Sequence, residues 1–117
     1  MLSDMEMERE RLQGEIASLQ RAIAALGPLR PGTLYSRGNV CGRPGCRCGR
    51  ASHPVKHGPY HYLSYTFQGK SHTEFVPEKA LAEVQAQVRN YKELRRLVER
   101  LVACNITLAR LARKEVS

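Results

Sequence analysis

Cys41-Gly-Arg-Pro-Gly-Cys46-Arg-Cys48 places three thiols within eight residues. Zinc prefers four nitrogen or sulfur ligands in a tetrahedron, and three cysteines with one histidine form a common structural set. Glycine permits tight backbone turns and a Pro-Gly step favours one, so the chain can turn back around an ion here. The spacing therefore predicts a zinc ion bound by Cys41, Cys46 and Cys48.

The fourth ligand should come from the histidines that follow the cysteines. His57 is separated from Cys48 by eight residues and begins His57-Gly-Pro-Tyr60, just before a predicted strand. A ligand in this place would let a rigid strand start beside the metal, so we predict His57. His53 is an alternative, and so are other groups, including Cys104 or a residue of another chain. Cys104 itself lies on the apolar seam of a predicted helix, which favours a place in a hydrophobic core.

Other interpretations of the thiols fit the pattern less well. A disulfide scaffold requires an even number of cysteines and an oxidising compartment, and three clustered thiols leave one over. An iron–sulfur cluster usually takes four cysteine ligands. Redox-active or unligated thiols are a further alternative. A structural metal site, with zinc as the ion, remains the prediction.

We call the segment from Cys41 to His57 the knuckle. A helix over about residues 3–26 precedes it. Its apolar residues recur at steps of four and three, which is the repeat of a coiled-coil seam. Ser3 followed by Glu6 has the pattern of a capping box, and Gly27-Pro28 should end the helix because proline cannot donate the next backbone hydrogen bond. The seam consists of Leu12, Ile16, Leu19, Ile23 and Leu26.

A second and longer helix, over about residues 78–115, follows Pro77, which suits a first helical position. It carries one apolar seam over residues 81–91 and another over residues 94–111. Val98, Val102 and Ile106 widen the second seam beyond what one narrow partner would cover. This helix would be about 57 Å long against about 36 Å for the first. We therefore predict that the two helices pack antiparallel and that the chain forms a homo-oligomer.

The middle of the chain is predicted to hold loops and short strands. Residues 33–36 have the composition of a short strand. Residues 60–67 and 71–76 are rich in β-branched and aromatic side chains, and Gln68-Gly-Lys70 between them favours a hairpin turn. The predicted fold class is α+β and mainly α, with two long helices in an antiparallel, coiled-coil-like hairpin that flanks a small zinc knuckle with a β-hairpin. The predicted segments are the N-terminal helix at 1–27, the knuckle and hairpin at 28–76, and the C-terminal helix at 77–117.

The charge of the chain is concentrated around the cysteines. The net charge is +8, and between Ile16 and Thr73 there are eight bases and no acid. Such a field attracts polyanions, whereas a solvated surface that serves solubility does not require so long a stretch without a carboxylate. The predicted contacts to nucleic acid are Arg37, Arg43, Arg47, Arg50, Lys56 and Lys70.

Aromatic side chains lie near these arginines and lysines in the sequence. Rings of this kind can stack with the bases of single strands. The alternative is that they cover the zinc site and the helices, as the core of a small hairpin requires, and this is the interpretation that we favour from sequence. The rings belong to Tyr35, Tyr60, Tyr62, Tyr65 and Phe67.

The cysteine stretch, followed by His57-Gly-Pro-Tyr60-x-Tyr62-Leu-Ser-Tyr65, then Gly69-Lys70 and Val76-Pro77, resembles a family of short bacterial and archaeal proteins. The resemblance covers roughly residues 32–111 and implies no particular activity. Members of that family accompany mobile-element genes, which favours a role with nucleic acid. Residues 1–26 lie outside this pattern, which predicts that they are particular to this protein.

These observations together predict a zinc-containing accessory protein that binds nucleic acid, DNA rather than RNA, beside a larger recombinase, transposase or nuclease. The alternative is a non-catalytic assembly subunit that docks onto a larger protein through its helices. An enzyme is not expected, because a zinc ion with four protein ligands has no open position and no carboxylate lies near the knuckle to act as a general base. No stretch approaches the roughly 20 apolar residues of a membrane span and no signal peptide is evident, which predicts a cytoplasmic protein without a membrane partner.

Overall fold

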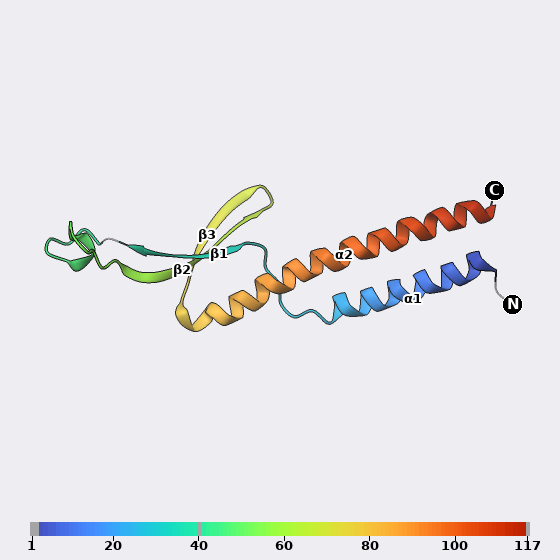
Figure 1. Cartoon of the computed structure of the whole chain (residues 1–117), viewed down its shortest axis with the longest axis horizontal. Helices are drawn as coiled ribbons and strands as arrows, with labels where there is room; N and C mark the ends of the chain where they lie inside the picture. The colour runs from blue at the N-terminus through green and yellow to red at the C-terminus, as the bar shows by residue number, and fades with distance from the viewer. Residues whose placement is uncertain (1–2, 40, 117) are drawn as a thin grey trace. The chain divides into compact units, whose positions relative to one another are not determined.

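The computed structural model describes residues 3–39 and 41–116 and has the predicted α+β class. Two helices and one antiparallel sheet make up the fold (Figure 1). In chain order the elements are α1 (Asp4–Ala24), β1 (Thr33–Asn39), a 3-10 turn (Arg47–Gly49), β2 (His57–Phe67), β3 (Lys70–Val76), a second 3-10 turn (Glu78–Ala80) and α2 (Leu81–Val116). The chain divides into two compact units, which we call the helical unit (Met1–Pro28 with Asn90–Ser117) and the sheet unit (Leu29–Arg89).

The start of α1 follows from its capping sequence. The Ser3 hydroxyl accepts a hydrogen bond from the backbone amide of Glu6 at 3.2 Å, so the predicted cap is confirmed. Asp4 and Glu6 in the first turn also complement the positive end of the helix dipole. The helix ends at Ala24 and the amide of Ala25 still bonds to Arg21, so the last turn closes before the predicted Gly27-Pro28 stop is reached.

Within the helical unit, α1 and the C-terminal part of α2 lie side by side and run in opposite directions (Figure 1). Leu12 and Leu19 are buried against Leu97 and Cys104, and six further aliphatic side chains surround them. Two ion pairs join the helices in the antiparallel order, Arg9 with Glu115 and Glu15 with Arg100. The predicted place of Cys104 in the hydrophobic core is confirmed.

The sheet unit is built on a three-stranded antiparallel sheet in the order β1-β2-β3. The sequence predicts a strand only over residues 33–36, but β1 is longer and belongs to the same sheet as the hairpin. It extends to Asn39 and pairs with β2 from Thr33↔Ser64 to Asn39↔His57. Arg37-Gly-Asn39 has little intrinsic preference for a strand, so only pairing with β2 holds it extended. The same pairing moves the start of β2 from the predicted residue 60 to His57.

The two predicted seams of α2 serve two different cores. Leu63 and Val76 of the sheet pack with Val84 and Val88 in the first turns of α2, and Leu63 is 0% exposed. The α-helix begins at Leu81 and not at the predicted residue 78, because Glu78–Ala80 form a 3-10 turn after Pro77. The second seam belongs to the helical core.

Three aliphatic side chains of the second seam stay in solvent, since α1 covers only one side of α2. They are Val98, Val102 and Ile106, which are 40%, 49% and 47% exposed. Although both helices of the described chain are long, neither is apolar enough over its length to cross a membrane.

Candidate metal centre

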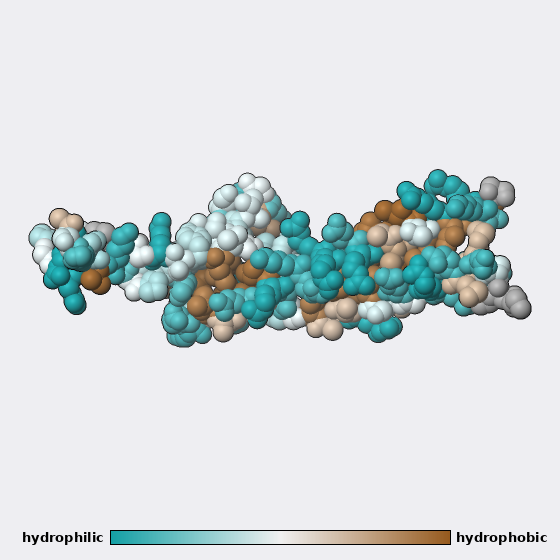
Figure 2. Space-filling model, in the orientation of Figure 1, coloured by the Kyte–Doolittle hydropathy of each residue, from teal (hydrophilic) through white to brown (hydrophobic). Residues whose placement is uncertain are grey.

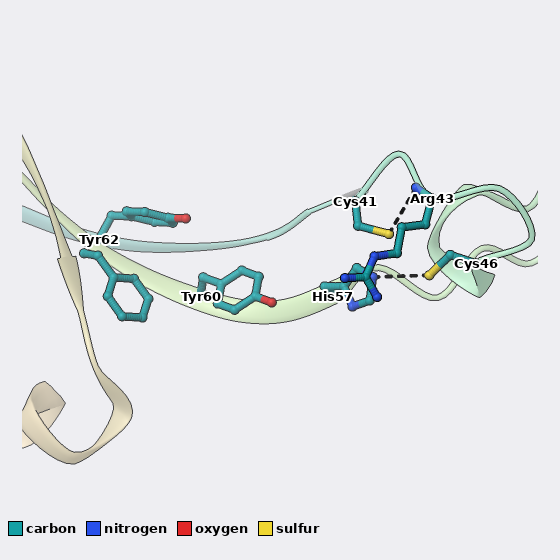
Figure 3. A pocket seen from close by; sticks show the side chains of 7 residues that line it. Cys41, Arg43, Cys46, His57, Tyr60 and Tyr62 are labelled. Carbon is teal, nitrogen blue, oxygen red and sulfur yellow. Dashed lines mark hydrogen bonds between the residues drawn. The ribbon is translucent and has the colours of Figure 1, made fainter.

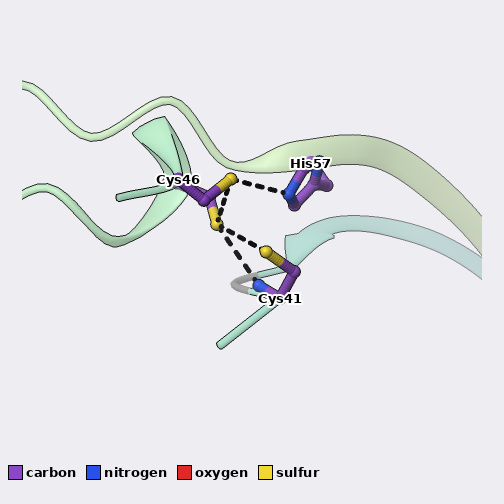
Figure 4. A group of neighbouring side chains, drawn as sticks. Cys41, Cys46 and His57 are labelled. Carbon is purple, nitrogen blue, oxygen red and sulfur yellow. Dashed lines mark hydrogen bonds between the residues drawn. The ribbon is translucent and has the colours of Figure 1, made fainter. Parts of the chain in front are cut away.

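Four potential metal ligands from separate local structures converge in the sheet unit (Figure 4). Cys41 follows β1, Cys46 caps the 3-10 turn that contains Cys48, and His57 is the first residue of β2. The three sulfur atoms and one imidazole nitrogen all lie within 4.8 Å of one another. The structure therefore brings together all four residues that the sequence singled out as metal ligands.

The distances within this Cys3His cluster suit one small ion. Cys48 Sγ lies 3.5 Å from Cys41 Sγ and 3.3 Å from Cys46 Sγ, and Cys46 Sγ lies 3.2 Å from His57 Nε2. A tetrahedral ion with sulfur ligands at about 2.3 Å would hold those sulfurs about 3.8 Å apart. Slight expansion of the cluster would therefore give the geometry of a four-coordinate site.

Tight turns hold the cysteines in place and direct amides at their sulfurs. Gly42 and Gly45 have φ values of +77° and +78°, in the left-handed region that favours glycine. In these turns the Cys41 amide donates to Cys48 Sγ at 3.3 Å, and the Arg43 amide donates to Cys41 Sγ at 3.5 Å. Such bonds stabilise thiolates, which are the form that binds metal.

The thiols do not share one electrostatic environment. Hydrogen bonds from the backbone and side chain of Cys48, then from Cys41, lower the pKa of Cys46 to about 6 against the opposing effect of burial. The Cys41 amide lowers the pKa of Cys48, but burial and the adjoining thiols of Cys46 and Cys41 outweigh it and raise that pKa. One sulfur of the cluster is therefore poised as a thiolate while its buried neighbour favours the thiol.

The structure also distinguishes His57 from the other candidates for the fourth metal ligand. Within residues 3–39 and 41–116, the cluster includes neither His53 nor Cys104. His53 stands in a bend with φ +52°, and Cys104 is buried in the helical core. His57 is held in register by its pairing with Asn39, so the strand start fixes the imidazole beside Cys46.

The predicted nucleic-acid contacts fall into two places. Arg43, Arg47, Arg50 and Lys56 lie in the segment between Cys41 and His57, and Arg37 lies on β1 close by. Lys70 begins β3 and pairs with Phe67 at the far end of β2, about 33 Å along the strand from His57. Lys70 is therefore not brought together with the other five bases.

The aromatic residues meet only in part the expectation that they cover the zinc site and the helices. Tyr65 packs against the core that contains Val84 and Val88 of α2, and Tyr60 and Tyr62 lie beside the metal cluster, whereas Tyr35 and Phe67 are exposed. The core face of the sheet carries Leu34, Leu63 and Val76, and side chains alternate between faces along a strand. Tyr65 and Phe67 share the core face, although Phe67 stays exposed at the hairpin end. The opposite face, which we call the aromatic face, carries Tyr35, Tyr60, Tyr62, Phe75 and Arg37.

Phe75 of the aromatic face is not among the rings predicted from the sequence, although a signal for it is present there. A two-residue turn at Gln68-Gly69 pairs Phe67 with Lys70, and this register places Phe75 opposite Tyr62. A cavity of about 820 Å³ connects this part of the sheet with the metal cluster. Its walls are formed by Cys41, Arg43, Cys46, His57, Tyr60, Tyr62 and Phe75 (Figure 3).

Residues 5–86 match the family model of a domain of unknown function, DUF6788. The chain belongs to this family. The match spans α1, the cysteine cluster, the whole sheet and the first turns of α2. No curated protein and no solved structure matches the chain.

The extent of the DUF6788 match corrects one expectation from the sequence. We expected residues 1–26 to lie outside the family pattern, but the match begins at residue 5 and so contains α1. The N-terminal helix is therefore a family feature from that residue on. Cysteines and tyrosines at fixed spacing form a distinctive pattern in the middle of the chain. The aliphatic residues of α1 recur at a spacing that many helices share, so they do not indicate a particular family.

Proposed function

We propose that this member of the DUF6788 family is a nucleic-acid-binding protein whose Cys3His cluster holds a structural zinc ion. Thiolate and imidazole ligands favour zinc over the hard cations magnesium and calcium, which take oxygen ligands. Four protein ligands would fill a tetrahedral ion, which supports a structural role and not a catalytic one. The zinc would fix the turns between Cys41 and His57 and with them the positions of the nearby bases.

The observation that carries the binding proposal is a group of five exposed cations without carboxylate partners among residues 3–39 and 41–116. Some arginines elsewhere are paired, as Arg30 is with Glu74 at 2.7 Å and Arg96 with Glu93 at 2.5 Å, whereas the segment that holds these five cations contains no acid. Cations free of such partners can neutralise phosphates and release the counterions of a nucleic acid. Hydrophilic atoms cover much of the visible side of the knuckle, with a few hydrophobic ones among them (Figure 2). The five cations are Arg37, Arg43, Arg47, Arg50 and Lys56.

Replacing Arg43, Arg47 and Arg50 together with alanine should weaken nucleic-acid binding for every sequence tested while the metal is retained. If each arginine neutralises one phosphate, the log–log slope of affinity against salt should become shallower by about 2–3. The affinity itself should fall by about a hundredfold at about 0.1 M salt. Fluorescence anisotropy over a salt series, with metal analysis of both proteins, measures these effects.

A triple variant of α2 provides the matched control, since Arg95→Ala, Arg110→Ala and Arg113→Ala remove the same charge from an exposed helix surface. This control should keep the parental salt slope. Equal losses in the two triple variants would mean that net charge, and not the knuckle, governs binding. Absence of binding to any nucleic acid at low salt would refute the proposed function.

An assembly role is a second candidate, and the exposed Val98, Val102 and Ile106 favour it. Full burial of such a side chain contributes roughly 1.5–3 kcal/mol, so a second copy on this stripe would be stabilised. We expect the chain to form a dimer or larger oligomer at micromolar concentration and Val102→Glu to shift it towards monomer in sedimentation velocity. Ala103→Glu, one residue further and also exposed, is the control and should not change the mass.

A parent protein that sediments as a monomer, without a partner protein present, would contradict self-association through this stripe. The association with a recombinase, transposase or nuclease stays a prediction from the sequence. It is compatible with both candidates, because one chain can bind nucleic acid through the knuckle and a protein through α2.

A further inference from the structure

The aromatic face of the sheet is arranged as a continuous platform. Tyr35, Tyr62 and Phe75 stand opposite one another on three neighbouring strands. The rings of Tyr35 and Tyr62 are stacked with centroids 5.6 Å apart, and Tyr62 and Phe75 meet edge to face at 6.0 Å. Tyr60 adds a second edge contact to Phe75 at 6.3 Å. Strand pairing and ring contacts thus order the rings before any ligand arrives, which reduces the entropic cost of binding.

These rings do not belong to the hydrophobic core of the sheet unit. The core lies on the other face, around Leu63 and Val76. Phe75 is 58% exposed, although a phenylalanine gains free energy from burial. An exposed aromatic surface on an ordered sheet indicates a ligand that uses ring contacts.

The charge around the platform indicates which ligand this is. The guanidinium carbon of Arg37 lies 5.1 Å from the centroid of the Tyr62 ring, and Arg43 lines the cavity that Tyr62 and Phe75 share. The described residues from β1 to Thr73 contain no acid, and Glu74 of β3 lies on the core face, where it binds Arg30 and Tyr65. Aromatic rings beside cations, without carboxylates, match the stacked bases and phosphates of a nucleic acid.

The platform also selects the form of the nucleic acid. Bases in a duplex are stacked on one another, and their faces are closed to a flat protein surface. An unpaired strand presents base faces to rings and phosphates to cations at once, as in other single-strand binding proteins. Tyr62, Tyr60 and His57 follow one another along β2 towards the metal cluster (Figure 3). A strand that follows β2 would therefore place its phosphates near Arg37 and Arg43.

We propose that the protein binds single-stranded nucleic acid on the aromatic face, with bases stacked on Tyr62 and Phe75 and with phosphates held by Arg37 and Arg43. This inference rests on the proposed nucleic-acid function and names the form that the site takes. The arginines that contact the strand belong to both parts of the unit, Arg37 to the sheet and Arg43 to the knuckle. The metal cluster would therefore orient the charge of the knuckle, while the sheet supplies the stacking surface.

The test is fluorescence anisotropy of the zinc-loaded full chain with an unstructured oligonucleotide of about 15 nucleotides, a length that spans such a site. The same sequence is measured as single-stranded DNA, as single-stranded RNA and as a DNA duplex. We expect both single strands to bind more tightly than the duplex. Tyr62→Leu and Phe75→Leu should each weaken single-strand binding by about 5- to 150-fold, the loss of one base stack, and leave duplex binding unchanged.

Two controls separate stacking from structural damage. Phe67→Leu removes an equally exposed ring, at 58%, from the core face, and it should not change affinity. Tyr62→Phe keeps the ring and should bind as the parent does. Circular dichroism and metal content identify any variant that fails to fold. If one of Tyr62→Leu and Phe75→Leu fails, the affinity of the other tests the stacking.

Three results would overturn the inference. If the parent binds duplex as well as single strands and the leucine variants lose nothing, the nucleic-acid function stands but stacking does not. If the variants change the oligomeric state and not the affinity, the aromatic face is a contact between copies of the chain. If no form of nucleic acid binds, the proposed function fails together with this inference. RNA binding far above DNA binding, or the reverse, would support stacking and identify the source of the strand.

Discussion

Replacing Cys48 with serine should abolish stoichiometric metal binding and unfold the segment between Cys41 and His57. Cys48 is buried at the centre of the cluster, with the sulfurs of Cys41 and Cys46 both within 3.5 Å. A serine hydroxyl does not replace a thiolate as a zinc ligand. Structural zinc contributes on the order of 10 kcal/mol to the folding of small motifs, which is more than this loop can recover from other contacts.

Metal analysis of the purified variant and hydrogen exchange of the knuckle amides measure this expectation. The parent should hold one zinc per chain, and amides of residues 41–57 should exchange slowly only while the metal is bound. Chelation of the parent should reproduce the exchange pattern of the variant. Cys104→Ala is the control, because Cys104 lies in the helical core and its loss should leave one zinc per chain. A Cys48→Ser protein that retains its metal and its protected amides would show that the cluster is not the metal site.

The features that the sequence predicted best are those with strong local signals. Ser3 and Glu6 placed the start of α1 correctly, since capping is a local hydrogen bond. The period of the apolar residues predicted the two seams of α2. It did not predict that each seam packs in a different core. One seam packs on the sheet through Val84 and Val88 and the other on α1, and such a division depends on contacts between distant segments.

The features that the sequence did not predict depend on strand pairing. The last three residues of β1, Arg37-Gly-Asn39, become a strand only through their partner in β2. Their pairing fixes which face each aromatic ring occupies, so the position of the rings could not follow from composition. The membership of His57 in the cluster could be predicted because its ligand type and spacing are local. The exclusion of Lys70 could not, because it requires the length and direction of β2.

Replacing Leu63 with alanine should cost the sheet unit about 2–5 kcal/mol in free energy of unfolding. Leu63 is fully buried, and Val76, Val84 and Val88 complete its small core, so the cavity has few neighbours that could fill it. Such a loss is a large part of the 5–15 kcal/mol that stabilise a typical domain, on the order of a third. Urea denaturation followed by tyrosine fluorescence reports on this unit, since four of the five tyrosines belong to it.

The outcome of the Leu63 substitution also separates the two sources of order in the sheet unit. The metal cluster lies at the His57 end of β2, whereas Leu63 pairs near the middle of the strand, between Leu34 and Glu74. If the apolar core stabilises the sheet independently, Leu63→Ala should lower stability to the same extent with zinc and with a chelator. Val116→Ala, at a position that is 88% exposed, should change it by less than about 0.5 kcal/mol in both conditions. A Leu63→Ala protein as stable as the parent while zinc is bound would mean that the metal alone holds the sheet, and the aromatic platform would then depend on the cluster for its form.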